Sequence, residues 1–186
     1  MSILKISRLG HPILRRVAAP LTAEVLASAD VQRLIDDMVA TMVDEEGIGL
    51  AAPQVHASVR LVVLGDPDAD AEDSDSLPLT VLANPIWRFR SAETDEAWEG
   101  CLSLPGLRGW VPRSLRVVVG GIDRTGRAVE ITAQGYLARV LQHEIDHLDG
   151  VLYPDRMTDL TRLTFLDEYR RYWQPDPDGD DDGDED

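Results

Sequence analysis

The clearest hydrophobic pattern in the chain lies between residues 30 and 44. Its apolar positions recur every three or four residues, as they do along one face of an α-helix, and they are Leu34, Ile35, Met38, Val39, Met42 and Val43. Asp30 suits the N-cap position, and Gly47 lies just beyond the other end. The pattern predicts an amphipathic helix from Asp30 to Asp44.

Several other segments have the apolar, β-branched composition that is typical of strands. These are residues 59–64 (VRLVVL), 79–89 and 115–122 (LRVVVGGI). The segment 79–89 predicts one strand, or two strands that are interrupted at Asn84-Pro85. Residues 127–132 alternate after an Asp-Arg-Thr-Gly turn, which predicts a hairpin with the strand before it.

Three further helices are predicted. Apolar residues at helical spacing, followed by Gly150 as a stop signal, predict a helix from Gly135 to Leu148. A charged amphipathic pattern predicts another from Leu160 to Trp173, and a short helix is expected near residues 13–17. Because the strands form hairpins and the helices stand apart from them, the order of elements favours an α+β fold.

The length indicates a single domain, and the composition shows an uneven distribution of charge. A chain of 186 residues suits a single domain, and its formal net charge of −16 is largely local. Residues 66–75 and 176–186 together carry fourteen of the 34 acidic residues, which leaves 20 acidic against 18 basic residues in the remainder. We expect a catalytic domain over residues 1–174, a solvated acidic loop at 66–75 and a disordered acidic tail at 175–186.

The same composition disfavours several function classes. Without a cluster of basic residues, the chain is not expected to bind DNA. It shows no signal peptide, and none of its apolar runs approaches the roughly 18 residues of a membrane span. Cys101 is the only cysteine, so an intrachain disulfide is excluded and a cytoplasmic location is predicted.

The stretch QHEIDHLDG (Gln142–Gly150) supplies the first candidate chemistry. On the predicted helix, His143 and His147 lie four residues apart and can share a metal ion, while Glu144 can carry protons. A third ligand is needed. The known extension of this motif places a histidine at the position of Tyr153 in this chain, so that extension is incomplete.

Two candidates for the third ligand remain. Glu168 would complete a zincin-type peptidase, and Cys101 would leave an open position on the metal, as catalytic tetrahedral sites do. A metal-stabilised binding module without enzymatic activity is a further alternative. It would need neither Glu144 nor the glutamine at position 54 and would usually offer a fourth protein ligand.

Two glycine-containing stretches accompany the metal motif. GIGLAAPQ (Gly47–Gln54) fits a relaxed dinucleotide-binding pattern, but a predicted helix precedes it and a strand follows it, so we interpret it as a tight glycine turn. EGCLSLPG (Glu99–Gly106) places Cys101 in a turn between strand-like segments.

Taken together, these three stretches resemble the peptide deformylase family. The likeness extends over about residues 4–156, includes RLGHPILR near the start, and is closest to the bacterial and organellar type. It implies antiparallel sheets packed around a central metal-binding helix, with N- and C-terminal helices. It also implies a metal-dependent hydrolase that removes the N-formyl group from the initiator methionine of newly made proteins and releases formate.

The resemblance also implies roles for individual residues. Cys101, His143 and His147 would hold the metal, which the family implies is Fe²⁺, with Zn²⁺, Ni²⁺ or Co²⁺ able to replace it. Glu144 would carry the proton, while the Gln54 amide and the Leu102 backbone N–H would stabilise an oxyanion. We expect the following residues to bind substrate: Ile48, Gly49, Arg108, Tyr136 and Val140.

The partners implied are formyl-methionyl nascent peptides, with a transient contact to the ribosome. Glu99 and Arg113 are expected to form an ion pair that supports the site.

Overall fold

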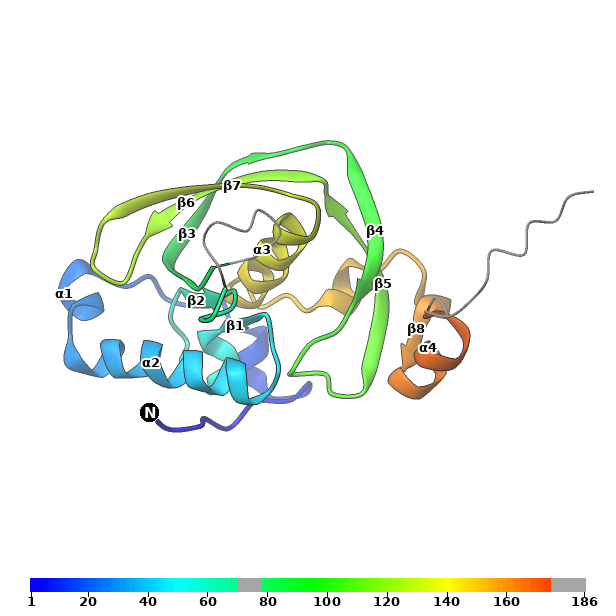
Figure 1. The fold of residues 1–186 in the computed structure, drawn as a ribbon, viewed down its shortest axis with the longest axis horizontal. Helices are drawn as coiled ribbons and strands as arrows, with labels where there is room; N and C mark the ends of the chain where they lie inside the picture. Colours follow the sequence, from blue (N-terminus) through cyan, green and yellow to red (C-terminus); the bar gives the residue numbers. More distant parts are fainter. Residues whose placement is uncertain (70–77, 175–186) are drawn as a thin grey trace, which may run out of the picture.

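Helix α3 (Gly135–Leu148) lies at the centre of the molecule and is enclosed by two β-sheets (Figure 1). The computed structural model describes residues 1–69 and 78–174. A five-stranded sheet has the order β1-β2-β3-β6-β7 and a three-stranded sheet the order β4-β5-β8, and every neighbouring pair is antiparallel. The α+β prediction is therefore confirmed.

The remaining elements are as follows. The strands are β1 (Gly49–Ala51), β2 (Leu61–Leu64), β3 (Thr80–Arg90), β4 (Thr94–Glu99), β5 (Leu107–Ser114), β6 (Arg116–Ile122), β7 (Ala128–Gln134) and β8 (Leu163–Phe165). The other α-helices are α1 (Ala23–Leu26), α2 (Ala29–Asp44) and α4 (Leu166–Tyr172). The 3₁₀ helices are η1 (Pro12–Arg15), η2 (Ala52–Val55), η3 (Tyr153–Arg156) and η4 (Leu160–Arg162).

One long ribbon of paired strands links the two sheets. Strand β3 leads into β4 through residues 91–93, and β5 leads into β6 through Leu115 alone, so the pair β3–β6 continues into the pair β4–β5. Ser91 fixes the corner, because its hydroxyl donates to the Glu93 carbonyl at 2.8 Å and accepts from the Arg116 N–H at 3.0 Å. The ribbon therefore bends around α3 (Figure 1) and carries its end loop, residues 100–106, to the helix.

Helix α3 is buried along most of its length, from Ala138 to Leu148. Its apolar residues pack into one core with Val62, Leu82 and Val119 of the five-stranded sheet. Helix α2 covers the other side of that sheet with Ile35, Met38 and Met42, as its amphipathic pattern predicts. The histidines and carboxylates on this buried helix need hydrogen-bond partners inside the protein, because water cannot reach them.

The segment 79–89 forms a single strand with an irregularity and not two strands. Asn84 has φ 49° and the register with β6 shifts between Ala83 and Ile86, as in a β-bulge. The Asn84 side chain accepts from the Leu21 N–H at 2.8 Å and donates to the Leu21 carbonyl at 2.7 Å. The bulge thus ties the N-terminal segment to the sheet.

Some predicted boundaries are wrong. Residues 160–173 do not form one helix, because β8 pairs with β5 in this segment, and that pairing satisfies backbone groups that a helix would otherwise use. Ser28, and not Asp30, caps α2, accepting from the Val31 N–H at 3.3 Å. The strand predicted at 59–64 begins at Leu61, and the helix expected near 13–17 is the 3₁₀ helix η1.

The predicted tail, residues 175–186, and most of the predicted acidic loop, residues 70–75, lie outside the described residues. The proposed domain limits therefore stay a prediction. Within residues 1–69 and 78–174, no helix is long and apolar enough to cross a membrane.

Candidate metal centre

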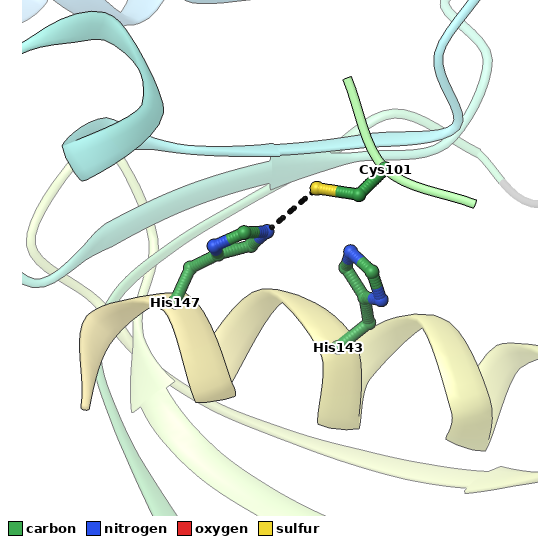
Figure 2. A group of neighbouring side chains, drawn as sticks. All are labelled: Cys101, His143 and His147. Atoms are coloured by element: carbon green, nitrogen blue, oxygen red, sulfur yellow. Dashed lines mark hydrogen bonds between the residues drawn. The ribbon is translucent and has the colours of Figure 1, made fainter. Parts of the chain in front are cut away.

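Cys101, His143 and His147 converge beside the centre of the fold (Figure 2). Helix α3 presents the two imidazoles one turn apart, and the end loop of the β4–β5 hairpin brings in the cysteine. Cys101 Sγ lies 3.2 Å from His147 Nε2, and one ligand atom from each of the three residues lies within 4.8 Å of the other two.

This set of donors fits a single divalent ion. An ion bound tetrahedrally at about 2.0–2.3 Å needs ligand atoms separated by about 3.3–3.6 Å, so small adjustments of these side chains suffice. One thiolate and two imidazoles are ligands that zinc, iron and neighbouring transition metals accept. Three protein ligands leave a coordination position open, which distinguishes a catalytic site from a closed structural one.

The carboxylate of Glu99 orients the first histidine. It accepts a hydrogen bond from His143 Nδ1 at 2.8 Å, which leaves Nε2 to face the metal position. It also accepts from Arg113 Nε and Nη2 at 2.8 and 2.9 Å and from Arg139 Nη1 at 2.9 Å. Burial raises the pKa of Glu99, but hydrogen bonds from Arg113 and His143 outweigh it and hold the pKa well below its ordinary value.

Arg113 extends this network along α3 to Asp146. Its Nη1 donates to Asp146 Oδ2 at 2.5 Å, and Arg156 donates to the same carboxylate from Nη2 at 2.7 Å. The expected Glu99–Arg113 pair is therefore present and buried, with both side chains 5 % exposed. Removing one partner of such a pair typically costs about 3–5 kcal/mol, so the network fixes β4, β5 and α3 relative to one another.

The two histidines differ in their preference for a proton. Burial lowers the pKa of His143, yet the neighbouring Cys101 and Glu99 raise it well above its ordinary value. Burial and then the charge on His143 lower the pKa of His147 well below that value. A bound metal ion would compete with protons for the two imidazoles.

Glu144 lies beside the metal ligands but faces β1. It is 4 % exposed, and none of the described residues donates a hydrogen bond to its Oε2. Burial raises its pKa to about 7. A Cβ atom on Gly49 would lie 2.5 Å from Glu144 Oε1, so only glycine lets the carboxylate occupy this position. A carboxylate with a pKa near neutrality can both accept and return a proton, and a nearby cation would favour its ionised form.

Gln54 is fixed with its amide nitrogen toward the cysteine loop. It is 2 % exposed, and its Oε1 accepts from the Ala51 N–H at 2.8 Å. Its Nε2 lies 3.5 Å from Cys101 Sγ and 3.3 Å from Ser103 Oγ. Because the backbone of Ala51 holds the oxygen, the amide can offer only its N–H groups to the site.

A cavity of about 140 Å³ opens next to these groups. Of the predicted substrate-binding residues, Ile48, Gly49, Tyr136 and Val140 line it, and Leu102, His143 and Glu144 border it as well. Arg108 is not among the lining residues. Its guanidinium lies over Gly100, where a Cβ atom would collide with it, and it donates to the Leu107 carbonyl at 3.0 Å.

The structure adds two residues that the sequence reasoning missed. Arg139 lines the cavity and binds Glu99, and Trp98 lines the cavity from strand β4. Arg139 precedes His143 by four residues and therefore shares its helix face, a spacing that could have identified it. No comparable pattern in the sequence marks Trp98.

The peptidase alternative is wrong. Glu168 lies exposed on α4, and in the described residues the metal-ligand group contains Cys101 instead. Tyr153, at the position of the missing histidine, stacks on His143 with ring centroids 6.2 Å apart. The other two histidines, His11 and His56, form a T-shaped pair of their own at 4.8 Å.

Comparison with known proteins identifies close relatives of this arrangement. Residues 3–163 match the family model described as polypeptide deformylase. Peptide deformylase 2 of Bordetella bronchiseptica is 45% identical over 163 residues, which cover 87% of this chain and 92% of that protein.

Two solved structures are also similar. The Met-Ala-Ser-bound class I type b peptide deformylase from Acinetobacter baumannii has a TM-score of 0.77 and 39% identity, covering 84% of this chain and 100% of that one. The peptide deformylase from Thermotoga maritima has a TM-score of 0.75 and 36% identity, covering 86% and 100%.

Cys101→Ala and Glu144→Gln should separate metal binding from proton transfer. The first substitution removes a ligand atom, and we expect the purified protein to lose most of its bound metal. The second keeps the three ligands, and we expect about one metal ion per chain, as in the unaltered protein. Metal analysis of both variants checks this, and full metal occupancy in Cys101→Ala would remove the sulfur from the coordination shell.

Proposed function

The chain belongs to the peptide deformylase family and is a metal-dependent amidohydrolase, and we propose that Glu144 carries the proton of its reaction while Gln54 and Leu102 stabilise the oxyanion. The observation that carries this proposal is the position of Glu144, which is buried, lines the cavity and directly follows His143 of the Cys101, His143 and His147 cluster in α3. The reaction is hydrolysis of the N-formyl group from a formyl-methionyl peptide, giving formate and a free amino terminus.

When bound at Cys101, His143 and His147, a divalent cation supplies Lewis-acid chemistry that lowers the pKa of water and polarises a carbonyl. Glu144 accepts the proton of the attacking water as the new C–O bond forms. It then returns this proton to the amine nitrogen as the C–N bond of the formyl group breaks. Proton transfer by a carboxylate positioned in this way contributes about 10²–10⁴ to the rate.

The tetrahedral intermediate carries negative charge on the former formyl oxygen. The Gln54 amide is aimed at the cysteine loop, where it can donate to this oxygen together with the backbone N–H of Leu102. Because the Ala51 backbone and Ser103 hold the amide in place before substrate arrives, little reorganisation is needed. Removing one such donor typically lowers kcat by about 10²–10³.

The substrate backbone has two strand edges available to it. Strand β1 is the terminal strand of the five-stranded sheet and β4 that of the three-stranded sheet, and both border the cavity. An extended peptide can pair with such an edge through its backbone groups. We infer that the peptide lies between β1 and β4, with the methionine side chain against Ile48, Tyr136 and Val140, and that Arg108 contacts its backbone farther out.

The metal and the setting are further parts of this proposal. We infer that the native ion is Fe²⁺, which Zn²⁺, Ni²⁺ or Co²⁺ can replace, since the Cys-His-His set accepts all four. We also propose that the enzyme acts in the cytoplasm on nascent chains, with transient contact to the ribosome.

Formyl-Met-Ala-Ser should release formate with metal-loaded protein, while an unformylated long peptide should stay intact. Residues 47–49 and the cysteine loop both line the cavity, and we infer that they crowd the acyl side of the site, leaving room for a formyl hydrogen but not for a preceding chain. Formate and peptide fragments are followed by mass spectrometry. Internal cleavage without formate release would contradict the proposed reaction.

Gly49→Ala should lower kcat by about 10–100-fold with metal content unchanged, because the added methyl displaces the Glu144 carboxylate from its position. Formate release and metal analysis measure the two quantities. Gly120→Ala is the matched control, since its methyl group would meet only the side chain of Arg88. Equal kcat in both variants would show that the approach of Gly49 to Glu144 has no role in catalysis.

The iron form should lose activity in air faster than the nickel form. Oxidation of Fe²⁺ and of the ligated sulfur of Cys101 are both available to the iron form in oxygen. Protein reconstituted anaerobically with either metal, then exposed to air and assayed over time, tests this. Equal half-lives would argue against oxygen-sensitive iron as the native ion.

A further inference from the structure

A second cavity, of about 250 Å³, lies where the ribbon of paired strands bends around α3. Its lining residues come from five elements: the end of β3, the start of β4, the end of β5, helix α3 and the 3₁₀ helix η3. Helix α3 contributes Gln142 and Asp146, which are four residues apart and share one face. Among the described residues, none lines both this cavity and the catalytic one, so the two sites are separate.

The wall of this cavity is positively charged. Three guanidinium groups line it, those of Arg90, Arg113 and Arg156. In the part of the chain that the structure describes, Asp146 is the only carboxylate among the lining residues. Three positive charges against one negative charge leave two positive charges, and a recess with such an excess attracts anions.

The inner part of the wall is buried and held by hydrogen bonds. Arg113 is 5 % exposed, and Gln142 and Asp146 are each 6 % exposed. Gln142 accepts from the Ser114 N–H and donates to the Ser114 carbonyl, both at 2.9 Å, while Arg113 donates to Glu99 and Asp146. The cavity therefore has a fixed inner surface, which is formed before any ligand arrives.

Two of the arginines keep hydrogen-bond donors for a ligand. Arg156 binds Asp146 through Nε at 3.1 Å and Nη2 at 2.7 Å, which leaves its Nη1 amino group for another acceptor. The Arg90 guanidinium lies 5.1 Å from the ring centroid of Trp87, within the range of a cation–π contact. The indole offers no oxygen acceptor, so the N–H groups of Arg90 can still bind an anion.

We propose that this cavity binds a phosphate group, either of inorganic phosphate or of a small phosphate monoester, with Arg90 and Arg156 as its principal donors. A phosphate group carries about −1.5 to −2 charges at pH 7, which balances the two positive charges of the wall. Its oxygens also match the paired N–H groups of arginine. A monoanion would balance only half of that charge. The site is independent of the deformylase reaction proposed above.

Binding of phosphate should stabilise the folded chain. The five elements that line the cavity meet only in the fold, so the unfolded chain has no equivalent site, and a ligand of the folded state alone raises its stability by mass action. Arg113 also joins the cavity to Glu99, the carboxylate that orients His143. The proposed phosphate would therefore help to hold the network that supports the metal ligands.

The test titrates the metal-loaded full chain with inorganic phosphate and with glycerol 3-phosphate by calorimetry, at an ionic strength kept constant with sodium chloride. We expect one phosphate group per chain and a rise in unfolding temperature with phosphate concentration. Tighter binding of glycerol 3-phosphate would identify the ligand as a monoester, and tighter binding of inorganic phosphate would identify the free ion. Absence of binding by both would overturn the proposal.

Arg90→Gln should weaken phosphate binding about tenfold, because it removes a charged donor at the cavity. Arg88→Gln is the matched control: it removes the same charge two residues earlier on β3, from a residue that lines a different cavity, and should leave the affinity unchanged. Equal weakening in both variants would show a general effect of net charge and would overturn the site. An affinity unchanged in Arg90→Gln, together with competitive inhibition of formate release by phosphate, would place the anion at the metal instead.

Discussion

The arrangement of the site depends on one buried carboxylate, that of Glu99. Placing an ionised carboxylate in the interior costs several kcal/mol unless hydrogen bonds and opposite charges replace its lost water. Here the replacements come from Arg113 on β5 and from Arg139 and His143 on α3. The charge is therefore compensated only when β4, β5 and α3 are all in their final positions, so forming the fold and orienting the first metal ligand are one event.

The two buried glutamates of the site, Glu99 and Glu144, have pKa values shifted in opposite directions by their surroundings. Glu99 has donors on both oxygens and stays ionised, whereas Glu144 is enclosed by β1 and α3 and has a pKa near neutrality. Shifting the pKa values of two neighbouring carboxyl groups in opposite directions gives one fixed charge and one group that can exchange a proton. The difference comes from the groups that each carboxylate contacts. Glu99 accepts hydrogen bonds from two arginines, whereas Glu144 packs against the backbone of Gly49.

Sequence reasoning succeeded where the pattern is local. The limits of α3 were predicted as Gly135–Leu148, and the His143/His147 spacing identified a metal site because both features depend on residues within a few turns of each other. Cys101 was identified as a ligand from its sequence motif, because no helical or strand spacing relates it to His143 and His147. The helix prediction for residues 160–173 was wrong because pairing with a strand some 55 residues earlier outweighed the helical pattern. Trp98 was missed because its neighbours Tyr169 and Trp173 reach it only in the folded chain.

The two sheet edges that flank the cavity restrict the physical state of a substrate. Backbone groups that pair with β1 or β4 must be unpaired in the incoming peptide. A protein whose first residues already belong to its own helix or sheet has none to offer, and a cavity of about 140 Å³ does not admit a folded domain. In the proposed binding mode, deformylation competes with the folding of the substrate protein and must occur before the amino terminus of that protein is incorporated into its own structure.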